Sequence, residues 1–132
     1  MERHSPDLGP GDEPAMTVLR LPFPPGVNNL FANGRKGRFR TARYDAWLLE
    51  AGLRLRRQRP EPIVGHFKVE MVFDRPDERA RDLDGLAKAP LDLLVKSQVV
   101  VDDSLCREIR MRWSGMPGRK PGGVLIFLEA AA

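Results

Sequence analysis

Two short acidic segments contain the side chains best suited to metal-assisted chemistry. The first holds Asp82, Asp84 and Lys88, and the second is the pair Asp102 and Asp103. Asp82 and Asp84 are two residues apart, so their carboxylates converge only if Asp82 is still extended or caps a helix that follows it. Asp102 and Asp103 end an extended run and should point to opposite sides, so only one of them easily joins the first pair.

Carboxylates without His or Cys partners form an oxygen-only site, which favours Mg²⁺ or Mn²⁺ over zinc. Such an ion activates water and neutralises phosphate oxygens, and Lys88 would hold the developing negative charge during attack on a phosphodiester. A structural alternative stays open. The i,i+4 series Asp84, Lys88, Asp92 and Lys96 is typical of an ordinary solvated helix face. Asp82 also suits a helix cap, and Asp102 a turn.

The positive charge of the chain is concentrated in one stretch. The net charge is +4, yet residues 35–59 carry nine basic and two acidic side chains. This excess indicates an acidic partner, with nucleic acid the leading candidate, or else a solvated basic helix face. A hard-metal site beside a surface that binds polyanions is the combination expected of a nuclease.

The hydrophobic pattern predicts one α/β (α+β) domain, with a mixed β-sheet packed by two main helices and a C-terminal β-hairpin. Residues 1–15 are rich in Pro and Gly and predict a disordered tail, so the domain would span residues 16–132. Residues 22–40 predict a loop ending in a basic run. The expected elements are strands at 16–21, 63–74, 105–113 and 124–129, and helices at 42–58, capped by Thr41, and 83–96, kinked or restarted near Leu86 because of Pro90.

Several classes of protein are excluded by composition. The single cysteine, Cys106, permits no internal disulfide. The longest apolar runs are too short to span a bilayer, so no membrane partner is expected. The first residues lack the apolar stretch of a secretory signal, and a cytoplasmic location is the simplest expectation.

Three motifs together resemble the RusA-type Holliday-junction resolvases. They are the segment from Arg81 to Asp92 (RDLDGLAKAPLD), the segment from Val101 to Ser104 (VDDS) and the segment from Leu21 to Asn29 (LPFPPGVNN). The resemblance covers roughly residues 16–130 in the same order. It implies a small homodimeric, Mg²⁺-dependent endonuclease that cuts four-way DNA junctions by paired symmetric nicks in recombination and repair.

Carried over by motif, Asp82, Asp84 and Asp103 resemble the metal-binding carboxylates, and Lys88 resembles the catalytic lysine. Mn²⁺ is expected to substitute for Mg²⁺. The chain departs from the family at Gly85, where Asn is common, and at Pro90. Two alternatives remain: a non-catalytic module that binds branched DNA, and a metal nuclease acting on flaps or forks.

The expected DNA contacts lie mainly before the first helix. The four basic side chains of residues 35–40 should meet phosphates rather than bases. The resemblance adds a role near the DNA for two asparagines. The full set of expected DNA-binding residues is Asn28, Asn29, Arg35, Lys36, Arg38, Arg40 and Arg81. Phe31, Phe39 and Tyr44 flank this run and either stack on unpaired bases or anchor the core.

Overall fold

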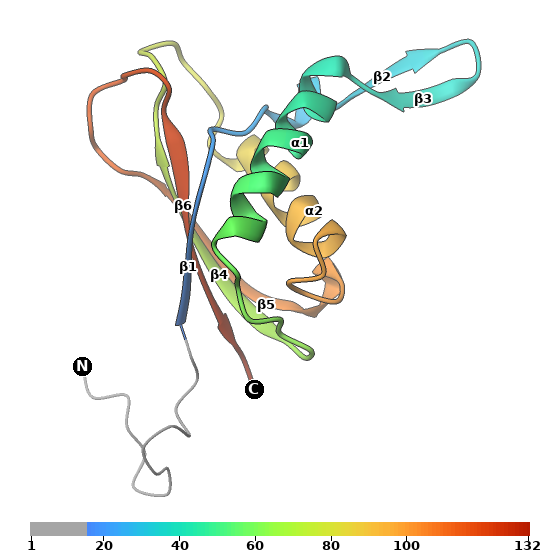
Figure 1. Cartoon of the computed structure of the whole chain (residues 1–132). Helices are drawn as coiled ribbons and strands as arrows, with labels where there is room; N and C mark the ends of the chain where they lie inside the picture. Colours follow the sequence, from blue (N-terminus) through green and yellow to red (C-terminus); the bar gives the residue numbers. More distant parts are fainter. Residues whose placement is uncertain (1–15) are drawn as a thin grey trace, which may run out of the picture.

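The computed structural model describes residues 16–132, so the predicted tail at 1–15 lies outside the described residues. A four-stranded sheet has the order β1-β6-β4-β5. Its strands are β1 (Met16–Leu21), β4 (Phe67–Asp74), β5 (Cys106–Trp113) and β6 (Gly123–Ala130). Strand β6 runs antiparallel to β1 and β4, whereas β4 and β5 are parallel, so the sheet is mixed. Two helices pack on one face of it (Figure 1), which confirms the predicted α+β class.

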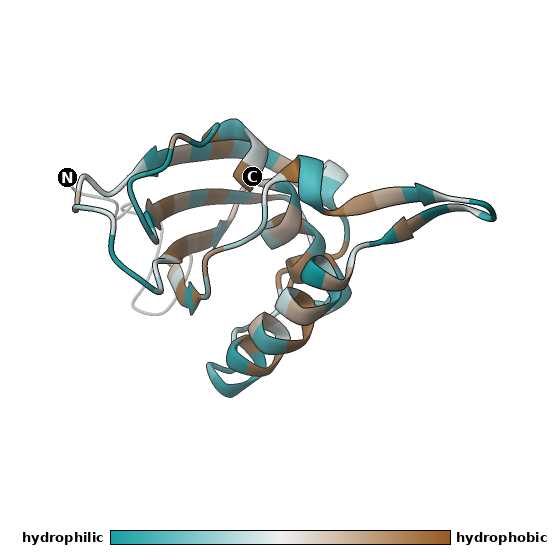
Figure 2. Ribbon diagram, turned by 90° about the horizontal axis from the view of Figure 1, so that it is seen from above, coloured by the Kyte–Doolittle hydropathy of each residue, from teal (hydrophilic) through white to brown (hydrophobic). Residues whose placement is uncertain are grey.

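Strand β4 lies inside the sheet, between β6 and β5, and it buries the apolar face of its sequence. Phe67, Val69, Met71 and Phe73 are all buried. These side chains face the helices and, with Ile126 of β6, belong to the main hydrophobic core. The brown bands in Figure 2 follow the sheet and the helix faces turned toward it.

Helix α1 (Ala42–Arg57) begins where the sequence predicts. The Thr41 side chain accepts a hydrogen bond from the Tyr44 backbone N–H at 3.1 Å, which makes it the N-cap. The buried face of the helix includes Tyr44, Trp47 and Leu55. The Trp47 Nε1–H donates to the Pro22 carbonyl at 3.1 Å, so α1 holds the proline-rich loop that follows β1.

The second predicted helix is divided into a short 3₁₀ turn, η2 (Asp84–Leu86), and helix α2 (Lys88–Lys96). Pro90 is the third residue of α2, where no backbone N–H has a partner inside the helix. The first hydrogen bond of the helix then comes from the Leu91 N–H to the Ala87 carbonyl at 3.1 Å. The expected restart is confirmed, and proline costs this helix no hydrogen bond.

Replacing Pro90 by Ala should therefore change the free energy of unfolding little, by less than about 1 kcal/mol. The ring is buried, so the small loss comes from packing and not from the backbone. Urea unfolding of Pro90→Ala beside the wild type measures the difference. As a positive control, Val95→Pro places proline in the last turn and should destabilise by about 3 kcal/mol. A change of that size in Pro90→Ala would contradict the assignment.

The predicted C-terminal hairpin is wrong in its pairing. Both strands exist close to the predicted bounds, but β4 lies between β5 and β6 and pairs with each of them. The connection over residues 114–122 crosses the end of β4 through bonds from the Ser114 N–H to the Phe73 carbonyl and from the Arg119 N–H to the Arg75 carbonyl, both 2.9 Å.

Composition explains this order of strands. The sequence of β6, GVLIFLEA, is almost wholly apolar and suits an interior position. Strand β5, CREIRMRW, carries three arginines and is mostly exposed, which suits a sheet edge protected by charge. Strand β6 pairs with β1 along one edge and with β4 along the other, and Val124, Ile126 and Leu128 are buried on one of its faces.

Residues 31–40 form a second, separate sheet where a loop was expected. Strands β2 (Phe31–Gly34) and β3 (Gly37–Arg40) pair antiparallel with each other only. They follow the 3₁₀ turn η1 (Val27–Asn29) and project from the body as an arm (Figures 1 and 2). Within residues 16–132, no helix is long and apolar enough to cross a membrane.

Candidate active site

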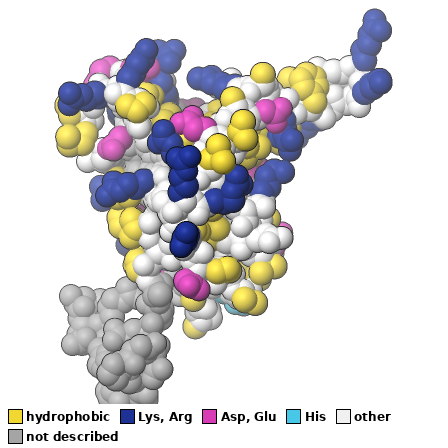
Figure 3. Space-filling view, viewed as in Figure 1, with side chains coloured by type: hydrophobic (Ala, Val, Ile, Leu, Met, Phe, Trp, Pro, Cys, Tyr) yellow, Lys and Arg dark blue, Asp and Glu magenta, His cyan; other side chains and the backbone are white. Residues whose placement is uncertain are grey.

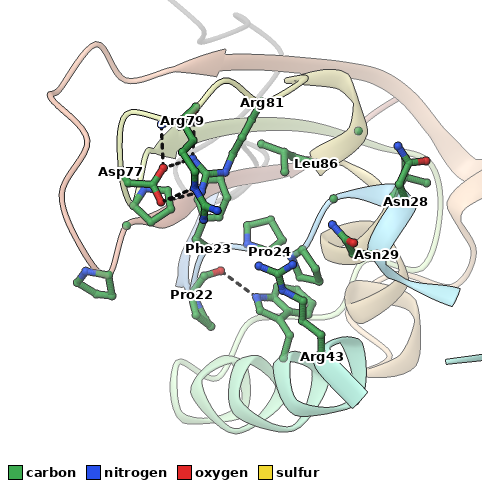
Figure 4. A pocket seen from close by; sticks show the side chains of 18 of the residues that line it. Pro22, Phe23, Pro24, Asn28, Asn29, Arg43, Asp77, Arg79, Arg81 and Leu86 are labelled. Atoms are coloured by element: carbon green, nitrogen blue, oxygen red, sulfur yellow. Dashed lines mark hydrogen bonds and ion pairs between the residues drawn. The ribbon is translucent and has the colours of Figure 1, made fainter. Parts of the chain in front are cut away.

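A groove of about 920 Å³ brings together segments that are far apart in the sequence. One wall is the loop 22–29 that follows β1, and another is the face of α1 that carries Arg43 and Trp47. The third wall is the loop 76–86 between β4 and α2, with residues 120–122 at one end. Figure 4 shows the side chains of these segments facing a common space.

Asp82 and Asp84 both line this groove. Their side chains are exposed, and neither makes a hydrogen bond or an ion pair within residues 16–132. Neighbouring Asp77 is paired with Arg79 and Arg81 instead. The turn η2 has no side-chain cap, so Asp82 does not serve as the helix cap that the structural alternative requires. The two carboxylates are therefore free for an external ligand.

Lys88 does not line the groove but is held in place at the start of α2. Its Nζ lies 3.1 Å from Asp92 Oδ1. The Tyr44 hydroxyl donates to Asp92 Oδ2 at 3.0 Å. Burial of Tyr44, reinforced by Asp92, raises the pKa of this phenol well above its usual range. Of the i,i+4 pairs in the series from Asp84 to Lys96, the Lys88–Asp92 pair thus forms. Asp92 is itself held by the buried Tyr44, so the pair orients Lys88.

The Asp102 and Asp103 side chains have different environments. Asp102 caps the 3₁₀ turn η3 (Asp103–Leu105) by accepting from the Ser104 N–H at 3.0 Å and from the Ser104 hydroxyl. These two bonds lower the pKa of the Asp102 carboxyl. Asp103 is exposed without a hydrogen bond or ion pair in the described part of the chain, and it does not line the groove.

The donor set fits a hard divalent ion at Asp82 and Asp84. Among residues 16–132, no three His, Cys, Asp or Glu side chains lie close enough to enclose a metal ion. Asp103 is therefore not gathered with the first two carboxylates within one chain. Mg²⁺ usually retains several waters and binds through one or two carboxylates plus phosphate oxygens of the substrate. Two free carboxylates beside cationic side chains meet that requirement.

Arg81 is engaged by protein groups. Its Nη1 and Nη2 donate to Asp77 Oδ1 and Oδ2 at 2.7 and 3.1 Å, and the guanidinium lies 5.3 Å from the centre of the Phe23 ring (Figure 4). The Arg81 side chain keeps only 19% exposure. These contacts fix the loop before Asp82 and leave little of Arg81 available to DNA.

The Arg81 pairing makes one contribution to stability depend on pH. The hydrogen bonds from Arg81 hold the pKa of the Asp77 carboxyl far below its ordinary value of 3.8. A lowered folded-state pKa gives stability that is present above the unfolded value and is lost as the pH falls toward the folded value. The melting temperatures of wild type and Asp77→Asn should therefore differ at pH 7 and converge only well below pH 3.8. A difference that disappears already at pH 5 would contradict this pairing.

Cationic side chains outside the expected set of DNA-binding residues also line the groove. Arg43 and Arg54 line it from α1, and Lys120 lines it from the connection before β6. With Trp47 and Glu50, the two arginines follow a helical stripe of spacing 4, 3 and 4, a signal present in the sequence. Lys120 approaches only through the crossing of β4, which no local pattern reveals. Asn28 and Asn29 line the groove as well.

Carboxylates repel the nucleic-acid backbone unless a cation lies between them. Exposed carboxylates and arginines in one groove are therefore the arrangement expected of a metal-dependent enzyme that acts on a phosphodiester. A sequence model of the family described as endodeoxyribonuclease RusA matches residues 22–127. The chain therefore belongs to the RusA endodeoxyribonuclease family, whose members generally depend on a divalent metal ion.

A named relative is similar over most of the chain. It is the protein called crossover junction endodeoxyribonuclease rusA from Enterobacteria phage HK97. The identity is 28% over 120 residues, which covers 83% of this chain and 93% of the relative.

Proposed function

We propose that this endonuclease resolves four-way DNA junctions by paired symmetric hydrolysis of phosphodiesters, in recombination and repair, with Mg²⁺ as its metal and Mn²⁺ as a substitute. The observation that carries the proposal is the pair of free carboxylates, Asp82 and Asp84, in a groove bordered by Arg43, Arg54 and Lys120. Family membership and the name of the HK97 relative support the choice of junction DNA.

In this mechanism, Asp82 and Asp84 would hold the metal ion from the groove. Asp103 is assigned as a third carboxylate on the family motif alone, because it does not lie with the first two within residues 16–132 of one chain. The ion supplies activation of water and neutralisation of phosphate charge. Lys88, oriented by Asp92, stabilises negative charge as the bond to the leaving oxygen breaks. Arg43 and Arg54 lie where they can contact the phosphates that flank the scissile bond. Water adds its oxygen to phosphorus, and the sugar oxygen leaves with a proton.

A homodimer follows from the symmetry of this substrate. A four-way junction offers two equivalent strands, and a dimer with a two-fold axis presents one groove to each of them. Two cuts at symmetric positions then yield two duplexes that need only ligation. Flaps and forks lack this symmetry, so they are the discriminating alternative substrates.

The test is a nicking assay on a synthetic four-way junction beside a flap and a linear duplex of matched sequence, each with Mg²⁺, with Mn²⁺ and with EDTA. Paired symmetric cuts in the junction, dependent on the metal and absent from the duplex, are expected. Preferential cutting of the flap would overturn the choice of substrate. Tight junction binding without cutting in either metal would overturn the catalytic assignment. Gly85 and Pro90, the two departures from the family pattern, would then be the first residues to test as the cause of the lost activity.

A further inference from the structure

The β2–β3 arm is a charged projection that contacts helix α1 through Phe31 and Arg40 at its base. Residues 31–40 include four basic side chains and no acidic one, and every residue from Asn33 to Arg40 is exposed. Figure 3 shows dark blue side chains at the tip of the arm. Arg35 and Lys36, in its turn, have no hydrogen-bond or ion-pair partner in the described chain. The tip of the arm therefore carries cationic side chains that the described residues leave available to an external anion.

The base of the arm is firmly attached beside the groove. The Thr41 N–H donates to the Leu30 carbonyl at 3.0 Å, and the Thr41 hydroxyl donates to the Asn29 carbonyl at 2.6 Å. The Phe31 and Tyr44 rings meet edge to face, with their centres 5.8 Å apart. Because Asn29 lines the groove, nucleic acid bound there would run past the start of the arm.

The register of the hairpin gives the arm two unlike faces. Phe31 is opposite Arg40 and Asn33 is opposite Arg38, so these side chains share a cationic face. Arg38 covers the Phe31 ring at 4.3 Å, and Arg40 pairs with Asp45 at 2.7 Å. The Phe31 ring, the only aromatic ring on that face, is therefore already covered by Arg38.

The other face is flat and apolar. It contains Ala32, Gly34, Gly37 and Phe39. A Cβ atom at Gly34 would lie 2.9 Å from the Phe39 ring, so the ring lies close along the strand instead of standing away from it. Phe39 is nevertheless 52% exposed. One side of an aromatic ring is therefore presented to solvent on an arm that is otherwise small and basic.

We propose that the arm recognises the branch point of the junction, with Phe39 stacking on a base that lacks a neighbour there and Arg35 and Lys36 contacting the adjoining phosphates. Aromatic stacking is tolerant of sequence because every base has an accessible π-face once it leaves the stack. In a linear duplex a base must first be unstacked before this face is accessible, whereas the stacking of bases is already interrupted at a branch point. The inference rests on the proposed function, and it assigns to Phe39 the preference of the protein for a junction over a linear duplex.

The experiment compares binding to a four-way junction and to a linear duplex of matched sequence, in EDTA so that neither is cut. Phe39→Ala should weaken junction binding about tenfold and change duplex binding less than about twofold. Phe39→Trp should restore the preference. A 2-aminopurine base at the branch point should be quenched by the wild type and by Phe39→Trp but not by Phe39→Ala.

The cationic tip provides a contrasting pair of variants. Arg35→Ala and Lys36→Ala should weaken both DNAs alike and reduce the dependence of binding on salt by about one ion each. Val64→Ala is the matched apolar control, because Val64 is 80% exposed and lies outside both the groove and the arm. Its junction preference should equal that of the wild type.

Two outcomes would overturn the inference without touching the proposed function. In the first, the wild type cuts junctions, but folded Phe39→Ala keeps the junction preference. In the second, sedimentation shows that Phe39→Ala breaks a dimer, which would assign the apolar face to a second copy of the chain. Failure of the wild type to bind or cut junctions at all would instead reject the proposed function.

Discussion

Asp82→Asn is expected to lose at least about 10²–10³-fold in the rate of junction cutting while still binding the junction. The substitution keeps the size of the side chain but removes the charge that binds the metal, and metal stabilisation of the reacting phosphate is worth several kcal/mol. Binding should be unchanged or tighter, since one negative charge beside the phosphates is gone. Single-turnover cleavage with saturating enzyme separates the two effects.

Glu70→Gln is the matched control for this result. Glu70 lies on β4 outside the groove and pairs with Arg112 at 3.6 Å on the surface. The same chemical change there should leave cutting within about twofold, because exposed ion pairs contribute little. Normal cutting by Asp82→Asn would refute the assignment of the site, and joint loss of binding and cutting would instead indicate a role in DNA docking.

Phe73→Ala is expected to lower the free energy of unfolding by about 3–5 kcal/mol, the usual cost of removing a buried aromatic ring. Phe73 has no exposed surface. Its ring contacts Phe23 and Trp113, with centres 6.2 and 6.1 Å away. Phe23 in turn lines the groove and lies under Arg81. The substitution should therefore loosen the loop before Asp82 as well as destabilise the domain.

Urea unfolding at one fixed protein concentration measures this loss, since association would shift the midpoint. Phe73→Leu retains most of the apolar volume and should lose only about 1–2 kcal/mol. A loss below about 1 kcal/mol for Phe73→Ala would contradict the central place of this ring. If Phe73→Ala cuts junctions normally below its melting temperature, the groove does not depend on the Phe73–Phe23 contact.

Local chemistry explains what could be predicted from sequence. The Thr41 cap, the end of α1 and the buried face of β4 depend on residues within a few positions of each other. Pro90 predicted either a kink or a restart in the second helix, and the structure has the restart. The pair Asp82 and Asp84 could be singled out by type and spacing, and their exposure in the groove agrees with that choice.

Long-range packing explains the features of the fold that could not be predicted from the sequence. Only the free energy of burying whole strand faces places apolar β6 between β1 and β4 and leaves arginine-rich β5 at the edge. That arrangement carries Lys120 to the groove. The pairing of Arg81 with Asp77 likewise depends on the fold of a loop with no periodic pattern.

The sequence by itself thus determined the class of domain, its helices and the apolar face of β4, because short-range hydrogen bonds and hydrophobic periodicity encode them. It also singled out the acidic pair, by residue type and spacing. Only the tertiary structure decided the order of the strands, the groove that joins three distant segments, and the arm that exposes Phe39. The strand order and the groove arise from contacts between residues many positions apart, whose energies depend on which surfaces the folded chain brings together. The arm is a local hairpin of residues 31–40, and the structure alone shows that this segment pairs with itself and leaves one face of Phe39 uncovered.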